Sequence, residues 1–296
     1  MIFSARFLAA LFATGGLVGQ VAVAQTSDPA ACRDKAQQIY AQETLDAADW
    51  KAIREQVICA NGDPVIGSQV SRLLAHAYFL VPQTDEEFAK SKTLLTAQVV
   101  LNPSDGVSAY FLASGIGNEW FGPKGDSNQD CVYYDLSARA GFARSFWPTG
   151  MCYLNGAHVE ADEKKAFEWV MKAAEQNDPN GLISAAVMHA IGQGTQQDTI
   201  KAAEFYERAV VYSQPGSLDQ MHALRGLGAM YAYDEIQAPN PATGVAMLQI
   251  AAEGGDEMAG DLITDLKASS TVLGYPDQGA IDSEIQRIKG LLTPTQ

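Results

Sequence analysis

The sequence predicts an all-α protein built from stacked helix hairpins. The stretch KAFEWVMKAAEQ begins at Lys165, and its near copy KAAEFYERAVVY begins at Lys201, 36 residues later. A second pattern, small residues followed by an aromatic residue or His, recurs about nineteen residues before the aromatic position of each copy. A period of this length is typical of repeat proteins, because one helix pair cannot bury its apolar faces alone and must stack on its neighbours.

The first pattern predicts the second helix of each hairpin. Its apolar residues fall at positions i, i+3, i+4 and i+7, which is one stripe on a helix. The stripe comprises Ala166, Trp169, Val170 and Ala173, and it returns 36 residues later as Ala202, Phe205, Tyr206 and Ala209. Counted from the Lys-Ala position, copies start near 51, 90, 129, 165, 201 and 243, so we expect about six hairpins.

The second pattern predicts the first helix of each hairpin. It reads TGMCYLNG at 149–156, AAVMHAIG at 185–192, LGAMYAYD at 227–234 and LAHAYFLV at 74–81. Gly156 and Gly192 are expected to end their helices, because glycine takes the left-handed conformation at little cost. Pro148 is expected to kink or delay the helix that contains it.

The two ends of the chain differ from the repeats. Residues 1–24 have a basic start, a short apolar run and Ala22-Val23-Ala24, which is typical of a cleaved secretory signal peptide. The alternative is an uncleaved membrane anchor, but the run is short and broken by glycines. Residues 280–296 predict an amphipathic helix that caps the repeats of 25–279. Its apolar face holds Ile281, Ile285, Ile288, Leu291 and Leu292, and its charged face Asp282, Glu284, Arg287 and Lys289.

The charge of the chain excludes some partners. The formal net charge is −15, and cleavage after residue 24 removes Arg6 and no acid, which gives −16. Phosphate backbones and anionic lipid headgroups repel such a protein, so nucleic acid is not expected as a partner. No later segment is apolar over a bilayer-spanning length, so no integral membrane segment is expected after leader cleavage.

Four cysteines in an exported chain favour disulfides over free thiols. In an antiparallel helix pair, residues equidistant from the turn lie opposite each other. Cys32 and Cys59 are centred near Leu45, and Cys131 and Cys152 near Gly141, where turns are expected. This geometry favours the pairs 32–59 and 131–152, each within one hairpin, over the other two connectivities.

The repeat resembles the Sel1-like repeat, a relative of the tetratricopeptide repeat, through its small-x-x-aromatic-x-x-Gly helix followed by KAxxWxxKAAEQ. The resemblance is clearest over 133–256, fair back to Leu74, and faint before that. It implies a right-handed α/α superhelical solenoid whose concave face makes contacts with other proteins. His189 stands where the family usually has an aromatic residue.

The sequence offers little for catalysis or cofactor binding. It has no G-x-S-x-G elbow, no Walker loop, no S-x-x-K signature and no His or Cys cluster with metal-ligand spacing. Asp126, Asn128 and Asp130 have the spacing that opens an EF-hand loop, but Cys131 replaces its glycine and Ser137 its final Glu. His76 and His189 occupy interior-type helix positions. We therefore expect no cofactor, no metal and no enzymatic activity.

Two pairs of residues are candidates for partner binding. The segment 115–130 is long and polar, and it carries Trp120 and Phe121 in its middle. Exposed aromatic residues on loops make strong anchors at interfaces, although the two rings could instead cover the end of a hairpin. Arg144 and Trp147, beside Pro148, are candidates for the concave face, where burial is equally plausible.

These observations predict a non-catalytic protein-binding scaffold or regulator of an envelope process, located in the periplasm or secreted. Some exported, cysteine-rich members of the resembling family have been associated with β-lactams. The alternative is therefore a hydrolase or ligand-binding protein directed at β-lactams or the cell wall. A third possibility is a secreted factor that binds host proteins.

Overall fold

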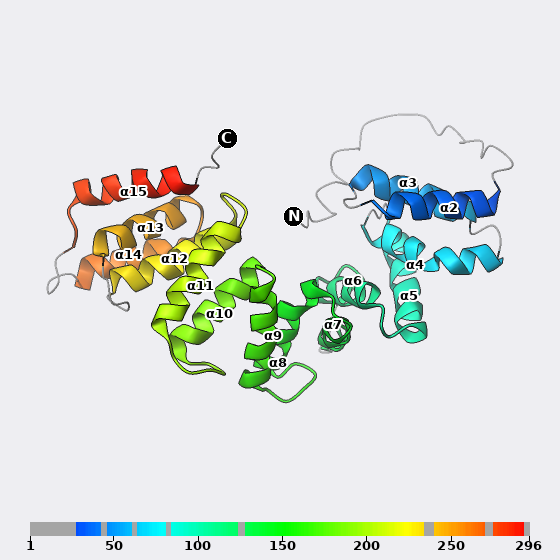
Figure 1. The fold of residues 1–296 in the computed structure, drawn as a ribbon, viewed down its shortest axis with the longest axis horizontal. Coiled ribbons are helices and arrows are strands. Elements are labelled where there is room, and N and C mark those ends of the chain that lie inside the picture. Colours follow the sequence, from blue (N-terminus) through cyan, green and yellow to red (C-terminus); the bar gives the residue numbers. More distant parts are fainter. Residues whose placement is uncertain are drawn as a thin grey trace. The chain divides into compact units, whose positions relative to one another are not determined.

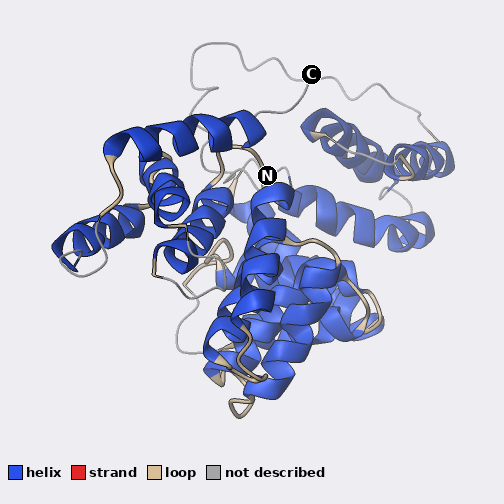
Figure 2. Cartoon of the chain, turned by 60° about the vertical axis from the view of Figure 1, so that its left-hand side comes forward, coloured by secondary structure: helices blue, strands red, loops and turns tan. Residues whose placement is uncertain are grey.

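The chain forms helices and loops, and no strand, within the residues that the structure describes (Figure 2). The structure is a computed structural model, and it describes residues 28–42, 46–60, 64–80, 84–123, 128–233, 240–269 and 275–292. The predicted signal peptide and Asp126 lie outside these ranges. The chain divides into two compact units, Met1–Phe142 (unit 1) and Ala143–Gln296 (unit 2), and each is described by itself.

Unit 1 contains three helix hairpins, in which consecutive helices pack together in the pairs α2/α3, α4/α5 and α6/α7 (Figure 1). Each hairpin also contacts the next, through α3 with α4 and α5 with α6. The helices are α2 (Pro29–Tyr40), α3 (Ala47–Ala60), α4 (Pro64–Leu80), α5 (Asp85–Leu101), α6 (Gly106–Gly117) and α7 (Gln129–Arg139).

Unit 2 contains three further hairpins, α8/α9, α10/α11 and α12/α13, and two more helices that both pack on α13. The helices are α8 (Phe146–Asn155), α9 (Glu163–Glu175), α10 (Pro179–Ile191), α11 (Thr199–Tyr212), α12 (Leu218–Ala232), α13 (Pro241–Glu253), α14 (Glu257–Ser269) and α15 (Gln278–Leu292). The described residues thus contain the six predicted hairpins, and the all-α helical-repeat fold is confirmed.

Helix caps recur with the period of the sequence. Asp162 and Asp198, 36 residues apart, precede α9 and α11, and each side chain accepts a hydrogen bond of 3.0 Å from the backbone N–H three residues later. Gly156 and Gly192 end α8 and α10 in the left-handed conformation, with φ of 66° and 75°, as predicted. The same residue types therefore start and stop the helices in successive repeats.

The predicted stripes face the interior of unit 2. Ala166, Val170 and Ala173 of α9 are buried, while Trp169 is partly buried. The equivalent residues of α11 behave alike: the alanines and Tyr206 are buried, and Phe205 is partly buried. The alanines allow close approach of neighbouring helices, and the aromatic rings fill the space beside them.

The C-terminal part of unit 2 differs from the prediction in two respects. A separate helix, α14, follows the last hairpin, and no copy of the repeat predicts it. Helix α15 runs beside α13 (red in Figure 1) and buries Ile281 and Ile288, as expected. Leu291, which we expected on the same apolar face, is exposed.

Pro148 delays the start of its helix, one of the two expected effects. A short 3-10 turn, η2 (Ala143–Ser145), precedes α8, and Pro148 is the third residue of α8 itself. A proline is tolerated in the first turn, because the N–H groups there have no partner within the helix.

The structure joins Cys32 in α2 to Cys59 in α3, within one hairpin. Cys131 and Cys152 are also disulfide-bonded, and no cysteine among the described residues is free. Cys131 lies in α7 and Cys152 in α8, which belong to different hairpins. The expectation that a 131–152 bond would lie within one hairpin is therefore wrong, because the turn near Gly141 separates two hairpins.

Replacing both Cys32 and Cys59 by Ser is expected to lower the free energy of unfolding of unit 1 by about 3.5 kcal/mol. The bond closes a loop with a sequence separation of 27, and it restricts the unfolded chain accordingly on the loop-entropy model. Chemical denaturation followed by circular dichroism measures the change. When the disulfides of wild type are reduced, the difference in free energy of unfolding between wild type and the variant should shrink. An equally large difference under reducing conditions would instead assign the effect to packing of Cys32.

Two glycines offer a matched test of helix packing. An added Cβ at Gly181 in α10 would lie 2.6 Å from Ala173 Cβ and 2.8 Å from Ala174 N, whereas at Gly260 in α14 it would meet nothing within 4 Å. Gly181→Ala is expected to lower the free energy of unfolding by about 1–3 kcal/mol, because the added methyl group overpacks the contact between α10 and α9. Gly260→Ala is expected to stabilise by about 0.5–1 kcal/mol, because it restricts the unfolded chain. Thermal or chemical denaturation of both variants tests this, and effects of the same sign would contradict the packing described here.

Candidate functional site

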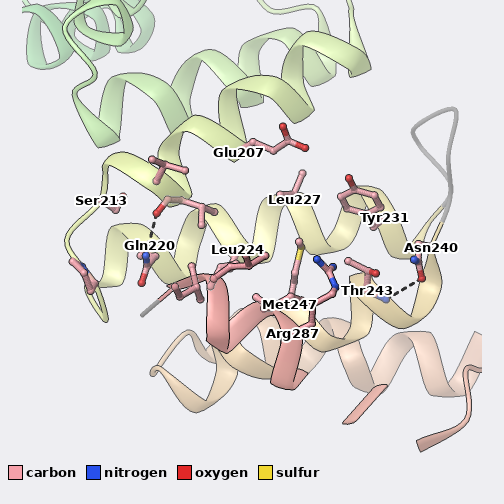
Figure 3. A pocket seen from close by; sticks show the side chains of 16 residues that line it. Glu207, Ser213, Gln220, Leu224, Leu227, Tyr231, Asn240, Thr243, Met247 and Arg287 are labelled. Carbon is pink, nitrogen blue, oxygen red and sulfur yellow. Dashed lines mark hydrogen bonds between the residues drawn. The ribbon is translucent and has the colours of Figure 1, made fainter. Parts of the chain in front are cut away.

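A groove in unit 2, formed by α11, α12, α13 and α15, has a volume of about 700 Å³ (Figure 3). Pockets of this size commonly hold small molecules or peptide segments. Its walls combine apolar side chains with a few polar groups at its two ends. This groove is the candidate functional site.

The floor of the groove is apolar. Leu224 and Leu227 of α12 are almost fully buried, and Met247 of α13 lies beside them (Figure 3). Gln220, Leu224, Leu227 and Tyr231 follow one another at i, i+4, i+7 and i+11, so they share one face of α12. Eleven residues at a rise of 1.5 Å make this face about 16 Å long.

One end of the floor is closed by the turn between α11 and α12. Gln220 stabilises this turn, since its Oε1 accepts a hydrogen bond of 2.9 Å from Gly216 N and its Nε2 donates one of 3.0 Å to Val210 O. Ser213 also lines the groove and is 4% exposed. Its Oγ has no hydrogen-bond partner among the described residues. A buried hydroxyl without a partner is unfavourable, so a ligand group that reached Ser213 Oγ would gain a hydrogen bond.

The other end is closed by contacts between α13 and α15. Thr243 Oγ1 donates a hydrogen bond of 2.7 Å to Glu284 Oε2, and Arg287 donates two more, of 2.7 and 3.0 Å, to the same oxygen. Hydrogen bonds from Arg287, then from Thr243, hold the pKa of Glu284 below its usual value. Glu284 and Arg287 therefore neutralise each other at this end.

The edge of the groove carries exposed apolar and acidic side chains. Val211 of α11 and Leu291 of α15 are 75% and 73% exposed. Glu207 of α11 is exposed, and no described cation lies within ion-pair distance of its carboxylate. An edge with exposed apolar groups and one uncompensated acid is suited to contact with another molecule.

The four residues predicted from sequence do not line this groove. Trp120 and Phe121 follow α6 in unit 1 and are partly buried against Phe79, at ring centroid distances of 5.3 and 5.8 Å. Phe121 also lies directly on Gly115, where an added Cβ would be 2.0 Å from the ring. The two rings therefore cover the end of a hairpin, the alternative that the sequence left open.

Arg144 and Trp147 lie at the beginning of unit 2. Arg144, in η2, is exposed. Trp147 is partly buried, and its Nε1 donates a hydrogen bond of 2.9 Å to Ser184 Oγ of α10. This bond fixes the indole ring between two hairpins of unit 2. A role for any of the four residues in binding stays a prediction.

A buried chain of polar side chains crosses unit 1. His76 Nε2 lies 3.0 Å from Ser108 Oγ, and Ser108 Oγ donates a hydrogen bond of 2.8 Å to Asp105 Oδ2. His76 and Ser108 are fully buried. Because the hydroxyl donates to Asp105, His76 Nε2 carries the hydrogen and donates to Ser108. A nucleophilic triad places the imidazole between the serine and the acid, so this arrangement, with serine in the middle, does not activate a nucleophile.

The second interior histidine, His189, packs between aromatic rings. It stacks on Phe205 with a centroid distance of 5.5 Å and an interplanar angle of 10°, and it meets Phe167 edge-on at 5.3 Å. The structure confirms the predicted packing role. It differs in one respect, because His189 Nδ1 has no hydrogen-bond partner among the described residues.

None of the described helices is long and apolar enough to cross a membrane. No group of three or more His, Cys, Asp or Glu side chains in the described ranges could hold a metal ion.

The buried His76 predicts a pH dependence of stability. Burial lowers the pKa of His76 from 6.5 to about 4, so the unfolded chain binds this proton more readily than the folded chain. The contribution of His76 is therefore constant above pH 6.5, and stability falls as the pH drops from 6.5 towards 4. The loss reaches about 3 kcal/mol, at 1.36 kcal/mol per pKa unit.

Denaturation of wild type and His76→Gln across this pH range measures the effect as a difference in slope. NMR titration of the His76 imidazole in wild type gives its pKa directly, and this measurement does not depend on whether the variant folds. A pKa near 6.5 would contradict the prediction.

Comparison with known proteins agrees with the repeat architecture. The family model described as Sel1 repeat matches residues 149–178, 181–210 and 222–256. These ranges coincide with most of the hairpins α8/α9, α10/α11 and α12/α13. A search of the curated proteins finds no match.

Two solved structures share the fold at low sequence identity. A Sel1 repeat protein from Oxalobacter formigenes aligns with a TM-score of 0.58 and 17% identity, over 88% of this chain and 98% of that one. A protective antigen present in uropathogenic Escherichia coli strains, which displays an SLR fold, aligns with a TM-score of 0.56 and 14% identity, over 89% of this chain and 62% of that one. The chain therefore contains three matched Sel1 repeats, all in unit 2, and it has the helical-repeat fold of these neighbours.

Proposed function

We propose that this protein is a non-catalytic protein-binding scaffold or regulator of the cell envelope, and that the groove of unit 2 is its binding site. Sel1-repeat proteins generally act as protein-interaction scaffolds. The observation that carries the proposal is the groove itself, with an apolar floor, an exposed apolar edge and a buried hydroxyl without a partner among the described residues.

Two features support a location outside the cytoplasm, in the periplasm or the medium. The start of the chain is typical of a signal peptide, and Cys32 and Cys59 form a disulfide. Structural disulfides persist in oxidising compartments and are rare in the cytosol. The partner we propose is accordingly a protein or peptide of the envelope.

The groove variant Val211→Glu/Leu291→Glu is expected to weaken partner capture by about tenfold. Burying a carboxylate in an apolar contact is costly, and a few central apolar residues usually dominate an interface. Both positions are exposed in the free protein, so folding should be unaffected. The measurement is a crosslinked pull-down from envelope extract, quantified by mass spectrometry against wild type.

The matched control is Val100→Glu/Leu101→Glu on α5, two exposed apolar residues of unit 1 at 73% and 79% exposure. A partner that is lost only with the groove variant supports the proposal. Equal loss with both variants, or capture unchanged by the groove variant, contradicts it. Turnover of a chromogenic β-lactam by wild type, abolished by a groove substitution, would favour the hydrolase alternative.

A further inference from the structure

We infer that the groove of unit 2 takes an extended, basic peptide segment of about five residues with apolar side chains at its centre. This inference rests on the proposed function and names the chemistry of the partner. Four properties of the groove carry it: its dimensions, its floor, its charge, and the hydroxyl of Ser213.

The length of the groove suits an extended chain of about five residues. The face of α12 from Gln220 to Tyr231 is about 16 Å long, which an extended chain spans with about five residues at about 3.3 Å each.

The floor calls for apolar side chains in the middle of the segment. Leu224, Leu227 and Met247 form the centre of the groove, between the polar ends (Figure 3). Val211 and Leu291 extend the apolar surface to the edge, where both are now largely exposed. Leu224 and Leu227 are already almost fully buried, so one or two apolar side chains of a ligand would mainly remove Val211 and Leu291 from water.

The charge of the groove favours basic residues on either side of the apolar centre of the bound segment. Among the described groups at the groove, Arg287 is held by Glu284, whereas Glu207 has no cation within ion-pair distance. The chain as a whole carries a formal charge of −15. A Lys or Arg beside the apolar centre would pair with Glu207, and the field of the protein would steer such a segment towards it.

The buried hydroxyl of Ser213 favours a ligand whose backbone has unpaired polar groups at the end of the groove near the α11–α12 turn. Ser213 Oγ lines the groove and has no partner among the described residues. A hydroxyl both donates and accepts, and an extended chain presents unpaired backbone N–H and C=O groups. One such group would satisfy Ser213, whereas the backbone of a helix, bonded within itself, would not.

The test measures the affinity of labelled model peptides for the full chain by fluorescence anisotropy. The probes are the peptides KLVLK and ELVLE in one-letter code, which differ only in the sign of their charges, and KSGSK, which lacks the apolar centre. We expect KLVLK to bind at least about tenfold more tightly than either of the others at low salt. The charge-dependent part of this preference should shrink at 0.5 M salt, where the Debye length is only about 4 Å.

Three variants locate the binding. Glu207→Lys is expected to weaken KLVLK by about tenfold, while Glu204→Lys, an exposed residue of the same helix that does not line the groove, should change it less than about twofold. Ser213→Ala should weaken it about threefold or more. Equal effects of the two Glu variants would reveal non-specific attraction to an acidic protein and overturn the inference.

Other outcomes also overturn it. Equal binding of ELVLE contradicts the basic partner, and a helical circular dichroism signal from bound peptide contradicts the extended one. If no peptide binds while Val211→Glu/Leu291→Glu still loses its captured partner, the inferred chemistry fails and the proposed function stands. If no peptide binds and the groove variant also keeps its captured partner, both the inferred chemistry and the proposed function fail.

Discussion

The structure depends on one constraint: each helix of a hairpin has an apolar stripe that its partner cannot cover completely. Ala166, Val170 and Ala173 illustrate this, because α9 buries them against helices on both sides. In unit 2, α15 packs on α13, buries Ile281 and Ile288, and turns charged residues outwards. The groove forms between α11, α12, α13 and α15, and Val211 and Leu291 stay exposed at its edge.

The fold could be predicted from sequence because its determinants are local and recur. The 36-residue spacing, the stripes of α9 and α11, and Gly156 and Gly192 each specify one element, and all agree with the structure. The misses have physical causes. Helix α14 stands outside the repeat, so no copy pointed to it. The turn near Gly141 separates two hairpins, a distinction that the spacing of cysteines does not contain.

The candidate site was harder to predict, because exposure depends on which neighbours a helix meets. Trp120 and Phe121 look like loop anchors in the sequence, yet Gly115 and Phe79 provide a surface on which they pack. Leu291 belongs to an apolar stripe by spacing, but it lies in the last turn of α15, at the edge of the groove, and is largely exposed. A pattern of residues on one helix specifies its inner face; a groove requires the relative placement of four helices. The Ser213 hydroxyl, which has no partner among the described residues, likewise has no signature in sequence.

The caps of the repeat have a consequence for how such a chain changes during evolution. Asp162 and Asp198 begin equivalent helices with equivalent hydrogen bonds, one period apart. A duplication or deletion of exactly that segment would join like to like, leaving every cap and every stripe in register. The number of hairpins can thus change in a single genetic event without a new core. Each added hairpin also creates another inter-helix surface, on which new specificity can arise while the older groove is retained.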